Sequence, residues 1–275
     1  MKALRKVLAF VFVLVLASAA FAQTDSKTQQ MIDEVTQKAK AVNSYRADIK
    51  MEMAMQGEKM VSSGTMAFKR PDKVHMVTTM AMPSMPEMPP GMPGMPPGMS
   101  GGMKQEMYGS GDVLWNYMPA SRMAHKVDLA KVRKQYPQAP VAQPEDPSRP
   151  FDAFLKDKIK FVEKKTVEGK SVYVFEGDIS QAATRMSGGQ MGPHESPSRI
   201  AVWLNSDTGL PNKMFVYDMS NKLMMTHAYT NYKINVPIND SEFLFAPPAG
   251  VQIMDNTQSM IDSMKKMQQP SKGQK

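Results

Sequence analysis

Methionine is the residue whose type and spacing stand out in this chain, and it is most concentrated between residues 80 and 103. This segment contains eight methionines, seven prolines and five glycines, and no cysteine, histidine or aromatic residue. Thioether sulfur is a soft ligand, so methionines spaced two or three residues apart can gather around Cu(I). The same side chain is flexible and apolar, which suits contact with lipid. A metal-binding strap, a lipid-handling surface and a tolerated insertion are the three interpretations of this segment.

Other methionines follow the two-residue period of a strand. Met51 and Met53 fall on one face of a predicted strand, and Met76 and Met80 fall on one face of another. Each of them, taken singly, is equally well explained as ordinary core filler. As a set they favour an apolar pocket that adapts its shape, because methionine is unbranched, flexible and polarizable.

The residue patterns that usually perform catalysis are missing from the sequence. The four histidines, His75, His125, His194 and His227, have no metal-binding spacing such as His-Glu-x-x-His. The chain also has no Gly-x-Ser-x-Gly elbow and no phosphate-binding glycine loop. Because it has no cysteine, it has no disulfide, no thiolate metal site and no cysteine for lipid attachment. The sequence therefore predicts a protein that is not an enzyme and needs no cofactor.

The first 22 residues have the three parts of a secretory signal. A basic start is followed by an apolar run, residues 7–17, and by Ala20-Phe21-Ala22, which has the small-x-small pattern of a cleavage site. An uncleaved anchor is the alternative, but the run is shorter than the ~20 residues that a spanning helix needs. We therefore expect cleavage before Gln23 and a monomeric, periplasmic mature protein that does not span a membrane.

The net charge argues against a nucleic-acid partner. The formal charge is +8, with three cations in the signal, which leaves about +5 on the mature chain. The lysines between residues 156 and 170 are accompanied by one nearby aromatic residue, Phe161. Proteins that bind single strands usually interleave cations with several stacking aromatics. Weak attraction to anionic lipid head groups or to acidic partners stays open.

The elements that would position these residues are a helix and many strands. Apolar residues recur at three- and four-residue steps over 26–42, which predicts a helix capped by Asp25 or Ser26. A second short helix is predicted at 127–136. Most other segments alternate with period two and are joined by short turns, which predicts a large antiparallel sheet. The predicted domain covers residues 23–256, with an insertion at 82–103, and a polar tail follows at 257–275, with a short helix marked by Met260 and Met264.

Three motifs, in order along the chain, resemble the periplasmic lipoprotein carriers and lipoprotein-sorting proteins typified by LolA. Residues 64–74, GTMAFKRPDKV, are similar to a strand of that family that ends in Arg-Pro. Residues 109–119, GSGDVLWNYMP, resemble its Asp-Gly-x-x-Leu-Trp-x-Tyr-x-Pro segment, with Ser110 where the family has Asp. Residues 243–251, FLFAPPAGV, are similar to its terminal Phe-x-Phe-x-Pro-Pro-x-Gly-Val.

This resemblance implies a fold and a ligand. The fold would be mainly β, a curved antiparallel and incomplete β-barrel with an N-terminal helix and a helical lid on its concave face. Acyl chains of a lipoprotein would lie in the cavity, and the carrier would move them from an inner-membrane release complex to an outer-membrane acceptor. The residues expected to line the cavity are Met51, Met53, Met66, Phe68, Met76, Trp115, Tyr117, Trp203, Phe215 and Tyr217.

Arg70 is the charged residue on the predicted strand face that carries Met66 and Phe68. A lone arginine usually lies on the surface with its stem folded against apolar neighbours. The resemblance implies instead that an arginine at this position hydrogen-bonds the backbone of the helical lid and holds the empty cavity closed. We then expect Arg70→Leu to capture lipid but to release it more slowly, with Lys69 as the control position.

The sequence thus predicts a periplasmic carrier that binds the acyl chains of lipoproteins, or related lipids, and moves them toward the outer membrane. A Cu(I)-binding periplasmic protein and an envelope lipid or stress sensor on the same fold are the alternatives. In the family a short hairpin turn replaces the methionine-rich segment, which here is a tolerated insertion, an apolar flap over the cavity mouth, or a Cu(I) site. The methionines that would hold Cu(I) are Met82, Met85, Met88, Met92, Met95 and Met99.

Overall fold

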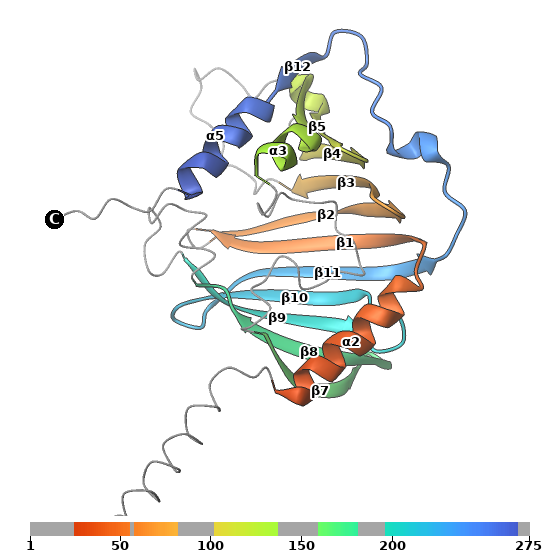
Figure 1. Ribbon diagram of the computed structural model, residues 1–275, viewed down its shortest axis with the longest axis vertical. Coiled ribbons are helices and arrows are strands. Elements are labelled where there is room, and N and C mark those ends of the chain that lie inside the picture. Colours follow the sequence, from red (N-terminus) through yellow and green to blue (C-terminus); the bar gives the residue numbers. More distant parts are fainter. Residues whose placement is uncertain (1–24, 56–57, 82–101, 137–158, 181–195, 269–275) are drawn as a thin grey trace, which may run out of the picture.

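The described part of the chain folds around one open sheet of twelve strands (Figure 1). The structure is a computed structural model that describes residues 25–55, 58–81, 102–136, 159–180 and 196–268. The strands lie in the order β12-β6-β5-β4-β3-β2-β1-β11-β10-β9-β8-β7, so the sheet ends at two edges. Their bounds are β1 Ser44–Met55, β2 Glu58–Lys69, β3 Lys73–Ala81, β4 Met103–Ser110, β5 Val113–Met118, β6 Met123–Asp128, β7 Ile159–Val167, β8 Lys170–Asp178, β9 Pro197–Asn205, β10 Pro211–Asp218, β11 Leu223–Ile234 and β12 Gln252–Asp255.

Neighbouring strands are antiparallel, with one exception in the described sheet. The short edge strand β12 runs parallel to β6, and Ile253 lies opposite Ala124. This direction is possible because residues 235–251 carry the chain along the sheet from β11 before β12 begins (Figure 1). The predicted fold class, a mainly β protein with an open, largely antiparallel sheet and an N-terminal helix, is confirmed.

The helices begin and end close to where the apolar periodicity predicts. Asp25 caps the first helix, because its side chain accepts a hydrogen bond of 3.2 Å from the amide of Lys27. The helices predicted at 26–42 and 127–136 are both present, as α2 and α3. The helical bounds are α2 Ser26–Lys40, η1 Pro119–Ser121, α3 Leu129–Gln135, η3 Asp240–Phe243 and α5 Thr257–Gln268.

Helix α5 occupies the first part of the predicted polar tail. Its Ile261 is 5% exposed and packs against Leu129 and Val132 of α3. Thr257 accepts a hydrogen bond of 2.9 Å from the amide of Asp128, at the start of α3. Residues 257–268 are therefore packed against the same body as the strands.

The three α-helices of the described residues, α2, α3 and α5, cover the same side of the sheet, which we call the helix face (Figure 1). Helix α2 lies over β7–β10, where Val35 packs with Phe161 and Phe175. Helices α3 and α5 lie at the other end of the sheet, where Leu129 packs with Leu114 of β5. Opposite residues in paired strands point to the same face, and the pairing is continuous from β5 to β8. The other side of the sheet is called the back face.

The back face carries a strap, which we define as residues 235–251, between β11 and β12. Phe243 of the strap is 1% exposed and packs with Ala67 of β2. The ring centroid of Phe245 lies 5.3, 5.1 and 5.3 Å from those of three aromatic residues, Tyr108, Trp115 and Tyr117. The Leu-Trp-x-Tyr motif and the Phe-x-Phe motif therefore pack against each other.

Ion pairs attach the strap to the strands beneath it. The guanidinium of Arg46 donates two hydrogen bonds of 2.6 Å to the carboxylate of Glu242. Asp240 accepts hydrogen bonds of 2.6 Å from both Lys69 and Lys73. A bidentate arginine–carboxylate pair holds both side chains in one geometry. The Arg46–Glu242 pair therefore fixes the position of the strap on the strands, in addition to the attraction between the two charges.

Acid should release the strap. The hydrogen bond from Lys69 lowers the pKa of Asp240 to about 2, and the hydrogen bonds from Arg46 lower the pKa of Glu242. Because both folded-state pKa values are depressed, these contacts contribute fully above the ordinary carboxyl pKa of about 4. The contribution of Asp240 is lost as the pH falls from about 4 toward its folded pKa of about 2. The contribution of Glu242 is lost as the pH falls below the ordinary carboxyl pKa toward its own depressed value. We expect the strap to loosen in that range.

Tryptophan fluorescence can follow this release. In a Trp203→Phe variant the signal comes from Trp115, which contacts Phe245 of the strap. The emission should change as the pH falls below about 4, and Asp240→Asn combined with Glu242→Gln should remove that step. An acid step that persists unchanged in the combined variant would show that other groups cause it.

Candidate ligand-binding face

Between α2 and the α3–α5 pair, the helix face is built largely from methionine side chains of β1–β4. Met76 lies opposite Met66 in one neighbouring strand and opposite Met107 in the other, and Met53 lies opposite Met60. Met66 is buried and the others are half-buried. This surface, which we call the methionine strip, consists of Met51, Met53, Met60, Met66, Met76, Met80, Met103 and Met107.

The strip is apolar because the charged residues of the same strands point the other way. On β1, Arg46, Asp48, Lys50 and Glu52 alternate with the methionines and lie on the back face. Thioether chains are flexible and make few directional bonds, so a surface built from them can adapt to a chain-like apolar ligand. Such a surface would bind by burial of apolar area and would release its ligand without breaking many hydrogen bonds.

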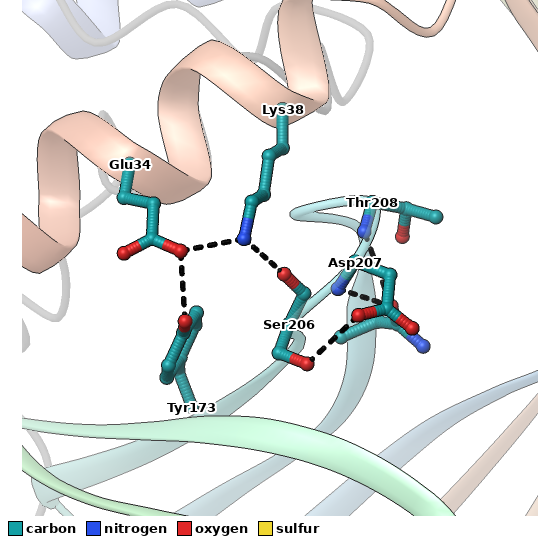
Figure 2. Close-up of polar contacts among 7 residues, drawn as sticks. Glu34, Lys38, Tyr173, Ser206, Asp207 and Thr208 are labelled. Atoms are coloured by element: carbon teal, nitrogen blue, oxygen red, sulfur yellow. Dashed lines mark hydrogen bonds and ion pairs between the residues drawn. The ribbon is translucent and has the colours of Figure 1, made fainter.

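Helix α2, which borders the strip, is tied to the sheet by a polar cluster (Figure 2). The ammonium of Lys38 donates to Glu34 and to the carbonyl oxygen of Ser206, both at 2.5 Å. The hydroxyl of Tyr173 donates to the same Glu34 oxygen at 2.8 Å. The hydrogen bond from Lys38 lowers the pKa of Glu34, so this carboxylate stays charged at neutral pH.

Two backbone contacts bring α2 close to the strands. The amide of Phe161 donates to the hydroxyl of Thr28 at 3.0 Å, near the start of the helix. Gly209, in the turn between β9 and β10, has a φ of +69°, and a Cβ there would lie 2.2 Å from the carbonyl oxygen of Val35. Glycine is therefore required at this position, and α2 is anchored along its length.

Arg70 lies at the C-terminal end of α2, the N-terminal helix. Its Nε donates to the carbonyl oxygen of Val42 at 2.8 Å, and its Nη2 donates to that of Ala39 at 3.1 Å. Its backbone amide donates to the carbonyl oxygen of Asn43 at 2.8 Å. The last carbonyls of a helix have no partner within the helix, and a cation is favourable at that end. Arg70 thus caps the helix where the chain turns into β1.

The ten residues predicted to line one cavity lie on two different faces. The helix face holds Met51, Met53, Met66, Phe68 and Met76, although Phe68 is fully buried beneath it. The back face holds Trp115, Tyr117, Trp203, Phe215 and Tyr217. Trp115 and Tyr117 are packed against Phe245 of the strap, and the ammonium of Lys165 lies 4.2 Å from the ring centroid of Trp203. A cavity on the helix face can therefore include only the first five.

The strand register adds methionines that the period-two pattern alone does not single out. Met60, Met103 and Met107 belong to the strip, and Met103 lies directly opposite Met80. Pairing residues on either side of the methionine-rich segment as a hairpin would have found this last contact from the sequence. The six methionines proposed for Cu(I) in that segment, like the predicted signal, lie outside the described residues.

A polar pocket lies at the back face, with a volume of about 690 Å³. Its lining includes Arg46, Asp48, Asn231 and Glu242, and Glu242 belongs to the strap. His75 also lines it, stacked on Tyr108 with 4.3 Å between ring centroids, and burial lowers the pKa of this histidine. Arg46 forms an ion pair with Glu242 in this pocket, and Asp48 accepts a hydrogen bond of 2.7 Å from the side-chain amide of Asn231. A lining with these charged groups is a poor environment for an acyl chain.

Two further properties concern the described part of the chain. In these residues no group of three or more histidine, aspartate or glutamate side chains is placed to hold a metal ion. No helix among them is long enough and apolar enough to cross a membrane.

No protein-family model matches the chain, and no curated protein matches it. Solved structures do show similar folds. An uncharacterized conserved protein from Thermus thermophilus is 9% identical with a TM-score of 0.49, over 84% of this chain and 99% of that one. The lipoprotein LppX of Mycobacterium tuberculosis is 12% identical with a TM-score of 0.44, over 78% and 98%.

A putative outer membrane lipoprotein-sorting protein domain from Vibrio parahaemolyticus is also similar in structure. It is 12% identical with a TM-score of 0.37, over 79% of this chain and 96% of that one. At these identities the likeness concerns the fold, and it carries no statement about what this chain binds.

Proposed function

We propose that this protein is an exported carrier that binds the acyl chains of lipoproteins, or of related lipids, on its methionine strip. The observation that carries the proposal is the concentration of half-buried thioethers on one face, with the charges of β1 on the other. Each CH₂ group buried there would contribute ~0.8 kcal/mol. The few directional bonds of the strip would allow the ligand to leave again.

The direction of transport is part of the same proposal. The signal pattern at residues 1–22 supports export to the periplasm. The three motifs that resemble lipoprotein-sorting proteins support delivery from an inner-membrane release complex to an outer-membrane acceptor. The carrier would act as a monomer without catalysing a reaction, because transfer of an intact lipid needs no bond to be broken.

Identification of the bound lipid tests the proposal. Protein purified gently from the periplasm should carry acylated molecules that mass spectrometry detects, and purified protein should extract lipoproteins from inner-membrane vesicles. Protein that is repeatedly free of lipid, and that also fails to extract lipoproteins, would contradict the carrier function.

Arg70 has a proposed role in release. By capping α2 it stabilises the empty, closed arrangement of the helix face, which would favour unloading. Hydrogen bonds from a charged group contribute about 1.5–3 kcal/mol each, so Arg70→Leu should lower the free energy of unfolding by at least about 1.5 kcal/mol. Capture of a labelled lipoprotein should persist in this variant, and transfer to acceptor membranes should slow.

The control for Arg70 must avoid the strap. Lys69, the control position expected from the sequence, is unsuitable. It donates to the carbonyl oxygen of Ile238 at 2.9 Å and to Asp240 at 2.6 Å, so it holds the strap. Lys59 is a better choice, because it lies on β2, the strand that ends just before Arg70, and its side chain is 64% exposed. Lys59→Leu should keep both the stability and the transfer rate, since exposed ion pairs contribute little. Equal transfer by Arg70→Leu and the unmodified protein would leave Arg70 with a structural role alone.

A further inference from the structure

A buried histidine lies among methionines at the centre of the helix face. His227 of β11 is 5% exposed, and β11 lies between β1 and β10. The residue directly opposite His227 is Met51 on one side and Met214 on the other. Met225 is two residues along the same strand and therefore on the same face, and Met53 lies opposite it. Thioether side chains thus border this imidazole on several sides.

The strand geometry places these sulfur atoms within reach of the ring. Directly opposite residues in an antiparallel pair have Cβ atoms about 4.5–5.5 Å apart. Met51 and Met214 therefore approach His227 from its two sides, and their flexible chains let the sulfur atoms turn toward the ring. The hydroxyl of Tyr229 lies 3.2 Å from Nδ1 of His227. A metal-binding histidine characteristically uses its other ring nitrogen in this way, which leaves Nε2 as the nitrogen that faces a ligand.

The donor set has a clear chemical preference. Imidazole and thioether are uncharged donors, and the thioether is soft, which favours Cu(I). Calcium and magnesium require several oxygen ligands, and in the described residues no cluster of three carboxylate or histidine side chains offers them. We propose that His227, Met51, Met214 and Met225 form a Cu(I) site on the helix face. This site goes beyond the carrier function and does not depend on it.

His227 belongs to a row of residues that lie opposite one another across neighbouring strands, and this row leads to the two ends of the methionine-rich segment. From Met51 it continues through Ser62 of β2 to Met80 of β3 and Met103 of β4. Met80 and Met103 are the methionines that flank residues 82–99 in the sequence. Apart from Ser62, the row therefore offers thioethers along the approach to His227.

Competition with a chromogenic Cu(I) chelator under anaerobic conditions tests the site in the full mature protein. The unmodified protein should retain one Cu(I) ion against the chelator. Two variants should each weaken this binding by at least about tenfold: His227→Gln, and the double variant Met51→Leu with Met214→Leu. Loss of a group that only supports a metal ligand already lowers metal affinity about tenfold or more. The leucine pair conserves volume, so the fold should persist even if the histidine variant is unstable. Met76→Leu with Met107→Leu, on the same face, is the matched control and should bind normally.

A second variant separates this site from the methionine-rich segment. Replacing the six methionines between residues 82 and 99 by leucine should leave the tight Cu(I) ion in place, and the ¹³C-methyl NMR signals of Met51, Met214 and Met225 should still shift on its addition. No retained Cu(I) in the unmodified protein would overturn the proposal. Loss of the ion in the segment variant, with normal binding by the His227 and Met51/Met214 variants, would also overturn it. Both results are independent of whether lipid binds.

Discussion

Met53→Lys should reduce the affinity of the protein for an acyl chain by roughly 50-fold. Met53 lies in the methionine strip, opposite Met60 and Met225. A lysine at this position would keep its ammonium hydrated and so would exclude about three CH₂ groups of the ligand. At ~0.8 kcal/mol for each CH₂ this loss is about 2.4 kcal/mol, which corresponds to the expected factor. Titration of a fluorescent fatty acid would measure it.

The neighbouring residue provides the matched control. Ala54 is exposed and lies on the back face, opposite Lys59. Ala54→Lys adds the same charge to the same strand, one residue away, without entering the strip. Its affinity for the fatty acid should match that of the unmodified protein. Similar losses in both variants would mean that the strip is not where the acyl chain binds.

Gly209→Ala should destabilise the protein strongly, because it forces α2 away from the sheet. The added Cβ would lie 2.2 Å from the carbonyl oxygen of Val35 and 3.0 Å from the amide nitrogen of Ala39. Val35 is 0% exposed, and full burial of such a side chain contributes about 1.5–3 kcal/mol. The left-handed φ of +69° adds about 1–2 kcal/mol for any residue with a Cβ. We expect a total loss of at least about 2.5 kcal/mol in urea unfolding.

Gly169→Ala separates the two causes. Gly169 has a φ of +75°, and a Cβ there would meet nothing within 4 Å. This variant should show only the backbone cost of about 1–2 kcal/mol. An equal loss of unfolding free energy in both glycine variants would show that α2 can move away from the turn at Gly209 at little cost. It would contradict the anchoring of α2 at Val35.

Periodicity predicted the elements well because tertiary packing reinforced the local preference. The apolar spacing at 26–42 matches α2, whose Val35 and Ala39 are fully buried. Asp25, one of the two predicted caps, is the residue that caps it. The strands that carry Met51 and Met76 were predicted equally well, because one side of each strand is mostly apolar and the other is mostly polar or charged.

The assignment of residues to faces was less predictable, and strand β5 shows why. Its sequence, VLWNYM, is apolar on both sides, so alternation gives no direction. Leu114 faces α3, whereas Trp115 and Tyr117 face the strap. The back face is apolar at this place because Phe245, more than one hundred residues later, covers it. A covering segment so distant in the sequence leaves no local sign in the strand.

Bulges in the strands are a second reason why the positions of residues in the sheet were hard to predict from the sequence. The pairing of β1 with β11 shifts between Arg46 and Asp48, and that of β9 with β10 shifts between Pro211 and Lys213. Each shift changes which residues lie opposite one another. The position of His227 opposite both Met51 and Met214 likewise required the structure, because no spacing within one strand brings these three residues together.

Photochemical labelling would show where on the protein an acyl chain binds. A fatty acid carrying a diazirine near the end of its chain would be bound to the protein, irradiated and located by residue-resolved mass spectrometry. If acyl chains bind on the methionine strip, the labels should lie on Met51, Met53, Met76 and Met80 of the helix face. Labels on Trp203, Phe215 or other residues of the back face, with the strip unlabelled, would contradict binding on the strip.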